Sequence, residues 1–321
     1  MRAQDPTSAA GSGEKVLWLH RTLSALGIDG ENPALTSEVD LTGIDVLRII
    51  VGLIVLYDAW ASLGWSHKTE MAQFLGVDIE SAWVALVVAA VSFLKLAIAA
   101  SLFAGRGVRP MGWAGVAYGL FVWLAVEHGG DFGQDATDPG VGLPYIVMFL
   151  YVVGADRLRA EGSAARNEVL ALARVVFGLL WAYDAVLKFQ PYFLTHYLDY
   201  LTEAETNTGA ATWQGAYLQI WISVSQAIGP TVIATLVAIA EAAIALGLLS
   251  GRGLRIFGPI GIALSLGIFT TAERWGGPYS LGAASDMPMR LFGVAIIYVI
   301  ALAYVWILYN PFDLVKGKSA T

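Results

Sequence analysis

The stretch LRIIVGLIVLYDAW at residues 47–60 recurs further along the chain as ARVVFGLLWAYDAV at residues 173–186. The two copies share chemically demanding residues at an offset of 126 residues, and the matched positions are Arg48 and Arg174, Gly52 and Gly178, Tyr57 and Tyr183, Asp58 and Asp184. Such identities indicate an internal duplication, and this duplication organises the interpretation of the whole sequence.

A second register extends the duplication. FAGRGVRPMG at residues 103–112 aligns with LSGRGLRIFG at residues 249–258, at an offset of 146 residues. The same register matches four ionisable residues, Glu127 with Glu273 and Lys95 with Glu241. The offset grows by 20 residues because the segment after the first helix is longer in the second copy.

Composition indicates a membrane protein. Mean hydropathy is +0.63, and only 14% of the 321 residues are charged, against about 25% in soluble proteins. Cysteine is absent, which excludes disulfides, thiolate metal sites, iron–sulfur clusters and cysteine nucleophiles. The net charge of −7 argues against a nucleic-acid partner, because neutralising phosphates requires a basic face.

Eight apolar runs approach the length of a membrane span, since a bilayer core of about 30 Å needs roughly 20 apolar residues in a helix. They cover residues 44–63, 82–104, 111–126, 141–155, 170–187, 230–249, 256–272 and 291–308. Each copy of the repeat holds four runs, an even number, so the copies are parallel rather than inverted. We predict an all-α integral membrane protein of eight transmembrane helices, built as two parallel tandem four-helix bundles.

Lysine and arginine in the connecting segments predict the orientation. Twelve collect on one side of this topology and four on the other, which places both termini in the cytoplasm and the chain in the cell membrane. The predicted domains are a cytoplasmic tail (1–43), a first unit (44–160), a second unit (161–310) with a long outside loop (189–229), and a cytoplasmic tail (311–321). The first tail lacks the pattern of a secretory signal and leaves room for a short interfacial helix.

Both units combine an arginine at the start of the first helix, a glycine four residues later and a Gly-Arg turn after a second helix rich in small residues. The matching residues are Arg174, Gly178, Lys188, Glu241, Gly247 and Gly251-Arg252, echoed by Arg48, Gly52 and Gly105-Arg106. This combination resembles the DoxX/DoxD family of four-helix membrane proteins, which includes the membrane subunit of thiosulfate:quinone oxidoreductase. The resemblance implies the four-helix unit and a quinone as cofactor. The chain departs from the family plan in being a fused double unit with a long loop.

Ionisable residues inside predicted spans are the candidate site, because a charge at the bilayer centre costs about 2.5–3.5 kcal/mol even on insertion scales. Asp184 and Lys188 lie four residues apart on one helical face. Glu241 lies near mid-membrane, and Glu273 and Arg274 end the seventh span. We expect these residues to form an outward-facing polar pocket beneath a lid of tyrosine, tryptophan and histidine side chains from the 189–229 loop. These lid residues are Tyr192, His196, Tyr197, Tyr200, Trp213 and Trp221.

A quinone head group needs a donor to each carbonyl and a route for protons. We assign the catalytic, proton-handling role to three acids, Glu241, Asp184 and Glu273. The quinone-binding role is assigned to the surrounding donors and aromatic side chains, Lys188, Arg274, Arg174, His196 and Tyr183.

Several of these residues also have a structural interpretation. An Asp184–Lys188 pair near the membrane surface is often a snorkelling ion pair. The arginines that begin the first and fifth spans lie on the cytoplasmic side, where they would anchor to lipid phosphates. Lys95 and Glu241, as repeat counterparts, would form a buried ion pair across the pseudo-twofold axis if their helices face each other.

The segment after the third span offers possible metal ligands. Glu127-His128 is followed by Asp131, Asp135 and Asp138, yet an acidic, glycine-rich loop explains the same stretch. No two of the four histidines stand three or four residues apart, so we predict no metal. We also predict no haem, because no span carries a histidine at mid-membrane.

The leading hypothesis is a quinone-linked oxidoreductase subunit of the thiosulfate:quinone oxidoreductase type, which passes electrons from an outside donor into the membrane pool. Two alternatives stay open, a small-solute transporter or permease, and a non-catalytic membrane anchor or assembly subunit of a redox complex. The expected partners are the lipid bilayer, a soluble or membrane redox subunit, and further copies of the chain if it forms a homo-oligomer.

Overall fold

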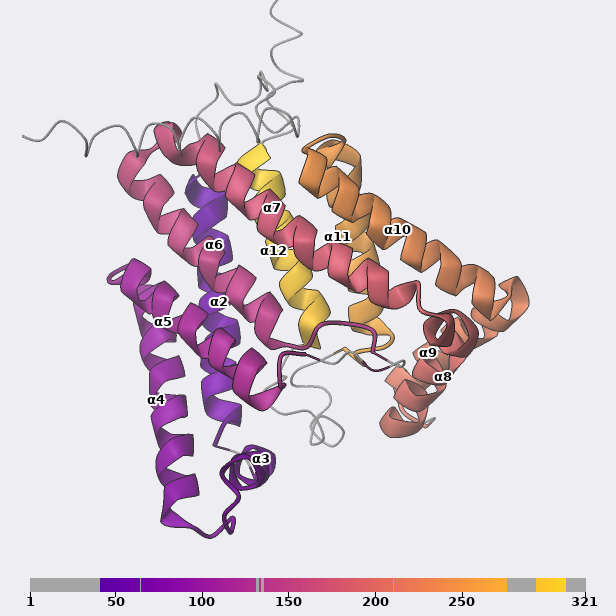
Figure 1. Cartoon of the computed structure of the whole chain (residues 1–321), viewed down its shortest axis with the longest axis horizontal. Helices are drawn as coiled ribbons and strands as arrows, with labels where there is room; N and C mark the ends of the chain where they lie inside the picture. Colours follow the sequence, from indigo (N-terminus) through magenta and orange to yellow (C-terminus); the bar gives the residue numbers. More distant parts are fainter. Residues whose placement is uncertain are drawn as a thin grey trace, which may run out of the picture.

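Helices make up every regular element of the part of the chain that the computed structural model describes, namely residues 41–63, 65–130, 133, 136–209, 211–275 and 293–309 (Figure 1). The predicted tail 311–321 lies outside these residues, and so does the predicted tail 1–43 except for residues 41–43, which begin α2. The helices of the first half are α2 (Leu41–Ala61), α3 (Trp65–Leu75), α4 (Ala82–Ala104), α5 (Val108–Phe121), its π-helical extension η2 (Val122–Val126), and α6 (Gly142–Glu161). Those of the second half are α7 (Ser163–Lys188), α8 (Pro191–Thr208), α9 (Trp213–Ile228), α10 (Pro230–Ser250), α11 (Leu254–Thr270) and α12 (Gly293–Tyr309).

Three of these helices are long and apolar enough to cross a bilayer, namely α4, residues 164–188 of α7, and α10. α11 and residues 294–309 of α12 are apolar but shorter. The outer faces of the long helices carry exposed apolar side chains, including Phe93 of α4 at 72% and Leu246 of α10 at 67% exposure. Apolar surface of this extent is typical of contact with lipid. The fold is therefore all-helical with membrane-spanning character.

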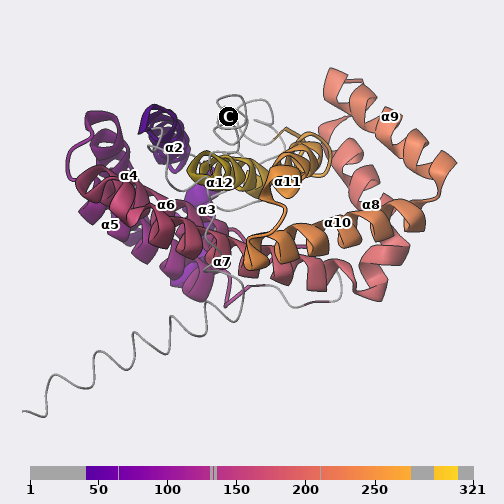
Figure 2. The same ribbon diagram turned by 90° about the horizontal axis from the view of Figure 1, so that it is seen from above.

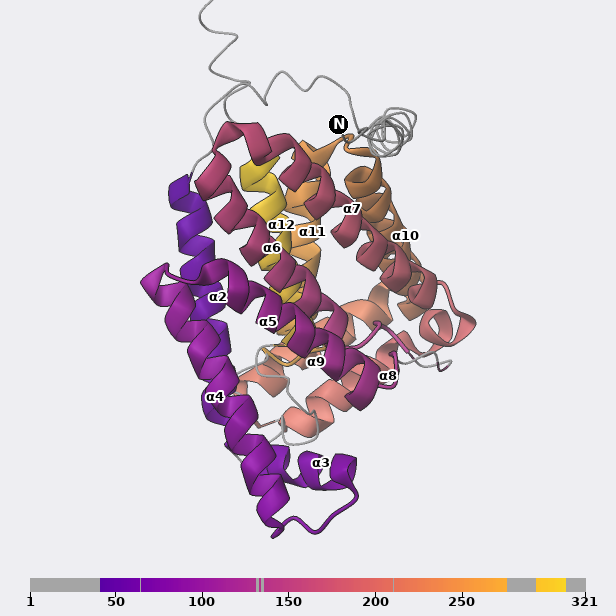
Figure 3. The ribbon, with the colours of Figure 1, turned by 60° about the vertical axis from the view of Figure 1, so that its left-hand side comes forward.

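The predicted apolar runs coincide with helices, but the segment predicted as a long outside loop does not stay irregular. Residues 189–229 form α8 and α9. Pro191 begins α8 at a position where its missing N–H is harmless. Thr212 caps α9 by accepting a hydrogen bond of 3.0 Å from the Gly215 N–H. In the first half, α3 occupies the corresponding place in the chain, near the Ala82 end of α4 (Figure 3).

Equivalent residues of the two halves make equivalent contacts. Arg48 donates a hydrogen bond to the backbone carbonyl of Leu102, and Arg174 donates to that of Leu248 at 3.0 Å. Glycine appears where these arginines approach the next turn. Gly251 has φ +68°, and a side chain there would collide with the Arg174 guanidinium. The Gly-Arg turns thus combine a left-handed backbone conformation with close packing of an arginine.

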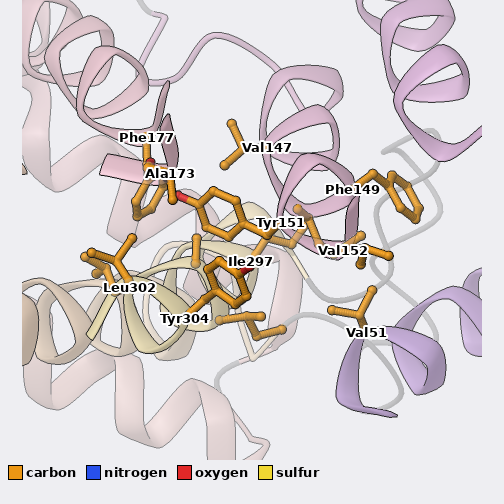
Figure 4. Close-up of a cluster of buried hydrophobic side chains, with 14 of the residues drawn as sticks. Val51, Val147, Phe149, Tyr151, Val152, Ala173, Phe177, Ile297, Leu302 and Tyr304 are labelled. Carbon is orange, nitrogen blue, oxygen red and sulfur yellow. Dashed lines mark hydrogen bonds between the residues drawn. The ribbon is translucent and has the colours of Figure 1, made fainter. Parts of the chain in front are cut away.

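A third register relates the last helices of the two halves at an offset of 153 residues. It matches Tyr151 of α6 with Tyr304 of α12, and these two rings stack with centroids 4.7 Å apart and an interplanar angle of 19°. Figure 4 shows the pair within the apolar core between the halves. Contact between equivalent residues is the arrangement expected at a pseudo-twofold axis between two copies of a repeat.

Candidate functional site

Three ionisable side chains and a tyrosine form a buried polar cluster in the second half. Nζ of Lys188 on α7 lies 3.4 Å from Oε1 of Glu241 on α10. One turn earlier on α7, Oδ2 of Asp184 accepts a hydrogen bond of 2.6 Å from the Tyr298 hydroxyl of α12. Asp184, Lys188 and Glu241 are 4%, 8% and 2% exposed. We call these four residues the second-half cluster.

Two carboxylate oxygens of the second-half cluster have no hydrogen-bond partner within the described part of the chain. They are Oδ1 of Asp184 and Oε2 of Glu241, and both atoms are buried. Leaving a buried acceptor unsatisfied costs roughly 1–3 kcal/mol. Exceptions of this kind in folded proteins often mark a bound water, an ion or a functional role. The cluster can therefore accept further donors or protons.

The segment between η2 and α6 contributes to this cluster from the first half. Lys188 Nζ donates to the backbone carbonyl of Thr137 at 2.7 Å. Asp138 interacts electrostatically with all three ionisable side chains of the cluster. On α8, the ring of Phe193 lies with its centroid 5.5 Å from Lys188 Nζ. The site thus combines both halves, whereas sequence reasoning placed it in the second half alone.

The first half holds a counterpart in which the charges are ordered differently. Lys95 on α4 forms an ion pair with Asp58 on α2, with Nζ 2.8 Å from Oδ2 and both side chains buried. Lys95 also donates to Oγ of Ser62 at 2.7 Å. The proposed ion pair between Lys95 and Glu241 is therefore wrong, because each residue has its partner within its own half.

The repeat registers show how the two clusters differ. Ser62 corresponds to Lys188 at an offset of 126 residues, and Lys95 corresponds to Glu241 at an offset of 146 residues. The lysine of the first half is therefore on α4, the second predicted span of its unit, whereas the lysine of the second half is on α7, the first predicted span. Glu241 occupies the position that corresponds to Lys95. One acid faces one lysine in the first half, while two acids face one lysine in the second. The extra acid distinguishes the second-half cluster.

Glu273, predicted as catalytic, caps a helix. Its carboxylate oxygens accept hydrogen bonds of 3.0 and 3.1 Å from the backbone N–H of Ala295 in the first turns of α12. Glu127 does the same for α6, accepting from Val141 at 2.7 Å and from Gly142 at 3.0 Å. A carboxylate at a helix N-terminus satisfies free N–H groups and complements the helix dipole. The repeated contact explains both glutamates structurally.

Arg274 and Arg174, predicted to bind a quinone, have other neighbours. Arg174 is ten residues from Asp184 on α7, about 15 Å along the helix, and its buried guanidinium holds the end of α10. Because its side chain is buried against α10, Arg174 does not reach outward as an anchor to lipid phosphates would. Arg274 and Trp275 form a left-handed turn after α11, with φ 54° and 64°. The Trp275 ring packs on Trp213 of α9 with centroids 5.3 Å apart.

The remaining predicted residues lie on α7 and α8. Tyr183 is half-buried beside Asp184. His196 is exposed on α8, where its ring stacks on Tyr192 with centroids 4.2 Å apart. Burial raises the pKa of Tyr197 above its ordinary value, so this phenol stays protonated at neutral pH. Phe193, whose ring packs against the cluster lysine, was not among the predicted lid residues.

Tyr298 and Thr137 are site residues that sequence reasoning missed. Tyr298 had a signal in the sequence, because the third register matches it with Tyr145. In the structure Tyr145 interacts electrostatically with Asp58, the counterpart of Asp184. Thr137 contributes only its backbone carbonyl, and no residue type signals such a contact.

Metal-ligating geometry is absent from the described residues, where no three His, Asp or Glu side chains gather suitably. Of the ligands considered from sequence, Asp131 and Asp135 lie outside those residues. No family model, curated protein or solved structure matches the chain. Fold and site together define a helical protein of membrane-spanning character with a buried acid–lysine cluster.

Proposed function

We propose that the chain spans the cell membrane eight times, through α2, α4, α5, α6, α7, α10, α11 and α12, with both termini in the cytoplasm. The apolar surfaces of the long helices and the bias of basic residues toward one side support this topology. The second-half cluster then lies toward the outer end of α7, beneath α8.

We further propose that the second-half cluster binds a quinone head group and exchanges protons with it, as part of a quinone-linked oxidoreductase subunit. The observation that carries this proposal is the pair of buried carboxylate oxygens without partners, one on Asp184 and one on Glu241. Reduction of a quinone consumes two electrons and two protons, and the electrons would come from an outside donor or a partner subunit. Thiosulfate remains a candidate donor through the resemblance to the DoxX/DoxD family.

The residues of the second-half cluster can donate hydrogen bonds to a quinone and hold the protons that its reduction consumes. Lys188 supplies a donor that is already oriented by Thr137 and Glu241. Asp184 and Glu241 each offer one oxygen that can hold a proton for transfer. When protonated, either carboxyl becomes a donor to a quinone carbonyl. Phe193 provides an apolar wall next to the lysine. The donor set therefore fits a quinone when a carboxyl is protonated.

Quinone binding tests the proposal directly. The protein is purified in mild detergent, extracted lipids are analysed for quinone, and titration with a short-chain ubiquinone follows. We expect saturable binding that Glu241→Gln weakens at least tenfold, while Lys95→Met in the first-half cluster leaves it within twofold once folding is verified. Protein that contains no quinone and binds none when it is added rejects the proposal.

The two other functions are distinguished by the same preparation. Uptake of a small solute into proteoliposomes that Glu241→Gln abolishes, without quinone binding, would establish a transporter. Co-purification of a stoichiometric redox subunit, with neither quinone binding nor uptake by the isolated chain, would establish an anchor. In both cases the buried acid–lysine cluster would serve another role.

A further inference from the structure

The exposed surface of α9 divides into two strips along the helix. One strip is apolar and consists of Trp213, Ala216, Ile220, Val224 and Ala227, and the other is polar and consists of Gln219, Ser223 and Gln226. Successive members of each strip are three or four residues apart, so each strip follows one side of the helix. A third side, with Leu218 and Ser225, is buried.

The apolar strip is strongly exposed for a protein surface. Trp213, Ile220 and Val224 are 57%, 62% and 38% exposed, and Trp221 and Ile228 beside the strip are 40% and 56% exposed. The neighbouring α8 differs, because its exposed positions carry polar residues such as Asp199, Thr202 and Glu203. The helix pair therefore presents water-compatible surface on α8 and apolar surface on one side of α9.

The apolar strip continues into a lipid-facing surface. α9 ends at Ile228 and α10 begins at Pro230, with Gly229 between them at φ +107°. The outer face of α10 then exposes Val232 at 51% and Leu236 at 59%, on a helix long and apolar enough to span a membrane. Figure 2, which views α2 and α12 nearly end-on, shows α9 running lengthwise from the end of α10, which itself runs across this view.

α9 also lacks charge. Its sixteen residues include no Asp, Glu, Lys or Arg, so no charged group opposes shallow insertion. Tryptophan at such a position is favoured at the level of lipid head groups. On the polar strip, Gln219 donates a hydrogen bond of 3.2 Å to Glu205 of α8, which directs that strip toward the hydrated side of the helix pair.

We propose that α9 is an interfacial helix, which lies in the outer leaflet with its apolar strip among lipid chains and its polar strip toward water. The partner of this surface is the bilayer itself. This inference rests on the proposed membrane topology, and it is independent of what the second-half cluster binds. For Trp213 and Trp221 it is an alternative to the expectation that they form a lid over a pocket.

Adjacent residues on α9 provide a matched experiment, and the absence of cysteine from the chain removes background labelling. Single cysteines at Gln219, Ile220, Ser223 and Val224 are labelled with a nitroxide in phosphatidylcholine vesicles. Collision rates with oxygen and with a water-soluble nickel chelate then report membrane depth. We expect the labels at 220 and 224 to favour oxygen at least threefold over those at 219 and 223.

Two reference labels separate the possible failures. A label at Leu236 on α10 should favour oxygen, and one at Glu203 on α8 should favour the nickel chelate. Oxygen preference at 236 with equal, water-like values at all four α9 positions overturns the interfacial helix alone. Water-like values at 236 overturn the membrane topology. Low accessibility to both reagents at 220 and 224 would indicate a contact between two copies and would also overturn the proposal.

Discussion

Lys188 on α7 reaches Glu241 on α10, with Nζ and Oε1 3.4 Å apart, and this contact reverses the charge order of the first half. There, the lysine is Lys95 on α4, and Ser62 at the end of α2 occupies the position that corresponds to Lys188. The chain thus contains its own reference arrangement for the second-half cluster. That reference defines the first prediction.

The double variant Lys188→Ser with Glu241→Lys should rebuild the first-half arrangement around Asp184. We expect it to unfold within a few degrees of the original protein, because one lysine again faces one acid. Lys188→Ser alone should be less stable by about 3–5 kcal/mol, since it leaves buried acids without their cation. Thermal unfolding in detergent measures both. A double variant no more stable than its single parents would show that the two clusters are not interchangeable.

The same double variant also tests whether the second-half cluster binds a quinone. The rebuilt cluster no longer has the extra acid, so we expect binding to fall at least tenfold although the fold is kept. Titration with the short-chain quinone, after thermal unfolding has shown a native transition, gives the answer. Unchanged binding would remove the second-half cluster from the proposed site.

Tyr298→Phe removes the hydrogen bond of 2.6 Å that the Tyr298 hydroxyl donates to Asp184 Oδ2. We expect it to lower the free energy of unfolding by about 1–3 kcal/mol, because a buried carboxylate oxygen loses its partner. Tyr304→Phe is the control on the same helix, since the buried Tyr304 hydroxyl has no partner in the described residues. That change should be neutral or slightly stabilising. Equal effects of the two substitutions would contradict this account.

Gly251→Ala should be far more costly than Gly76→Ala. Both glycines have positive φ, +68° and +64°, but a side chain at 251 would displace the buried Arg174 guanidinium from its hydrogen bond to the Leu248 carbonyl, whereas nothing lies within 4 Å at 76. A left-handed alanine costs roughly 1–2 kcal/mol by itself, and we expect at least twice that at position 251. Comparable losses of stability at both positions would argue against the packing of Arg174 in this turn.

Glu273→Gln and Glu127→Gln should behave alike. Each weakens a cap at the start of the last helix of its half, and loss of a cap typically costs about 1 kcal/mol. We expect similar falls in thermal stability and quinone binding within twofold of the original protein. A tenfold loss of binding with Glu273→Gln alone would restore the catalytic role that the sequence suggested.

Apolar length and internal repetition were sufficient to predict where α2, α4, α5, α6, α7, α10, α11 and α12 lie, but not α3, α8 or α9. Residues 82–104 were predicted as a span and form α4 with those bounds. α8 and α9 were missed because their apolar residues are interrupted by acids in α8 and polar residues in α9, and neither has the uninterrupted run of a span. Their stability depends instead on packing against each other and against α10.

The candidate site was predictable in part. Asp184, Lys188 and Glu241 were identified because ionisable residues are costly in apolar helices. Their partners were not apparent, since Tyr298 is 114 residues from Asp184 and Thr137 is 51 residues from Lys188 in the chain. Such contacts depend on how helices pack. Glu273 and Arg274 were assigned to the site only because they lie at a similar predicted depth in the membrane. Depth does not distinguish a residue that caps a helix from one that lines a pocket.

The stacked rings of Tyr151 and Tyr304 have a consequence for how the two halves of the chain can differ. A residue that packs on its own equivalent is the mark of an isologous contact between two identical subunits. The contact is what a homodimer of two such units would have at its axis. In a homodimer, any substitution appears in both subunits at once. In the fused chain each half can carry its own polar cluster, and here one has Asp58 and Lys95 while the other has Lys188 and Glu241.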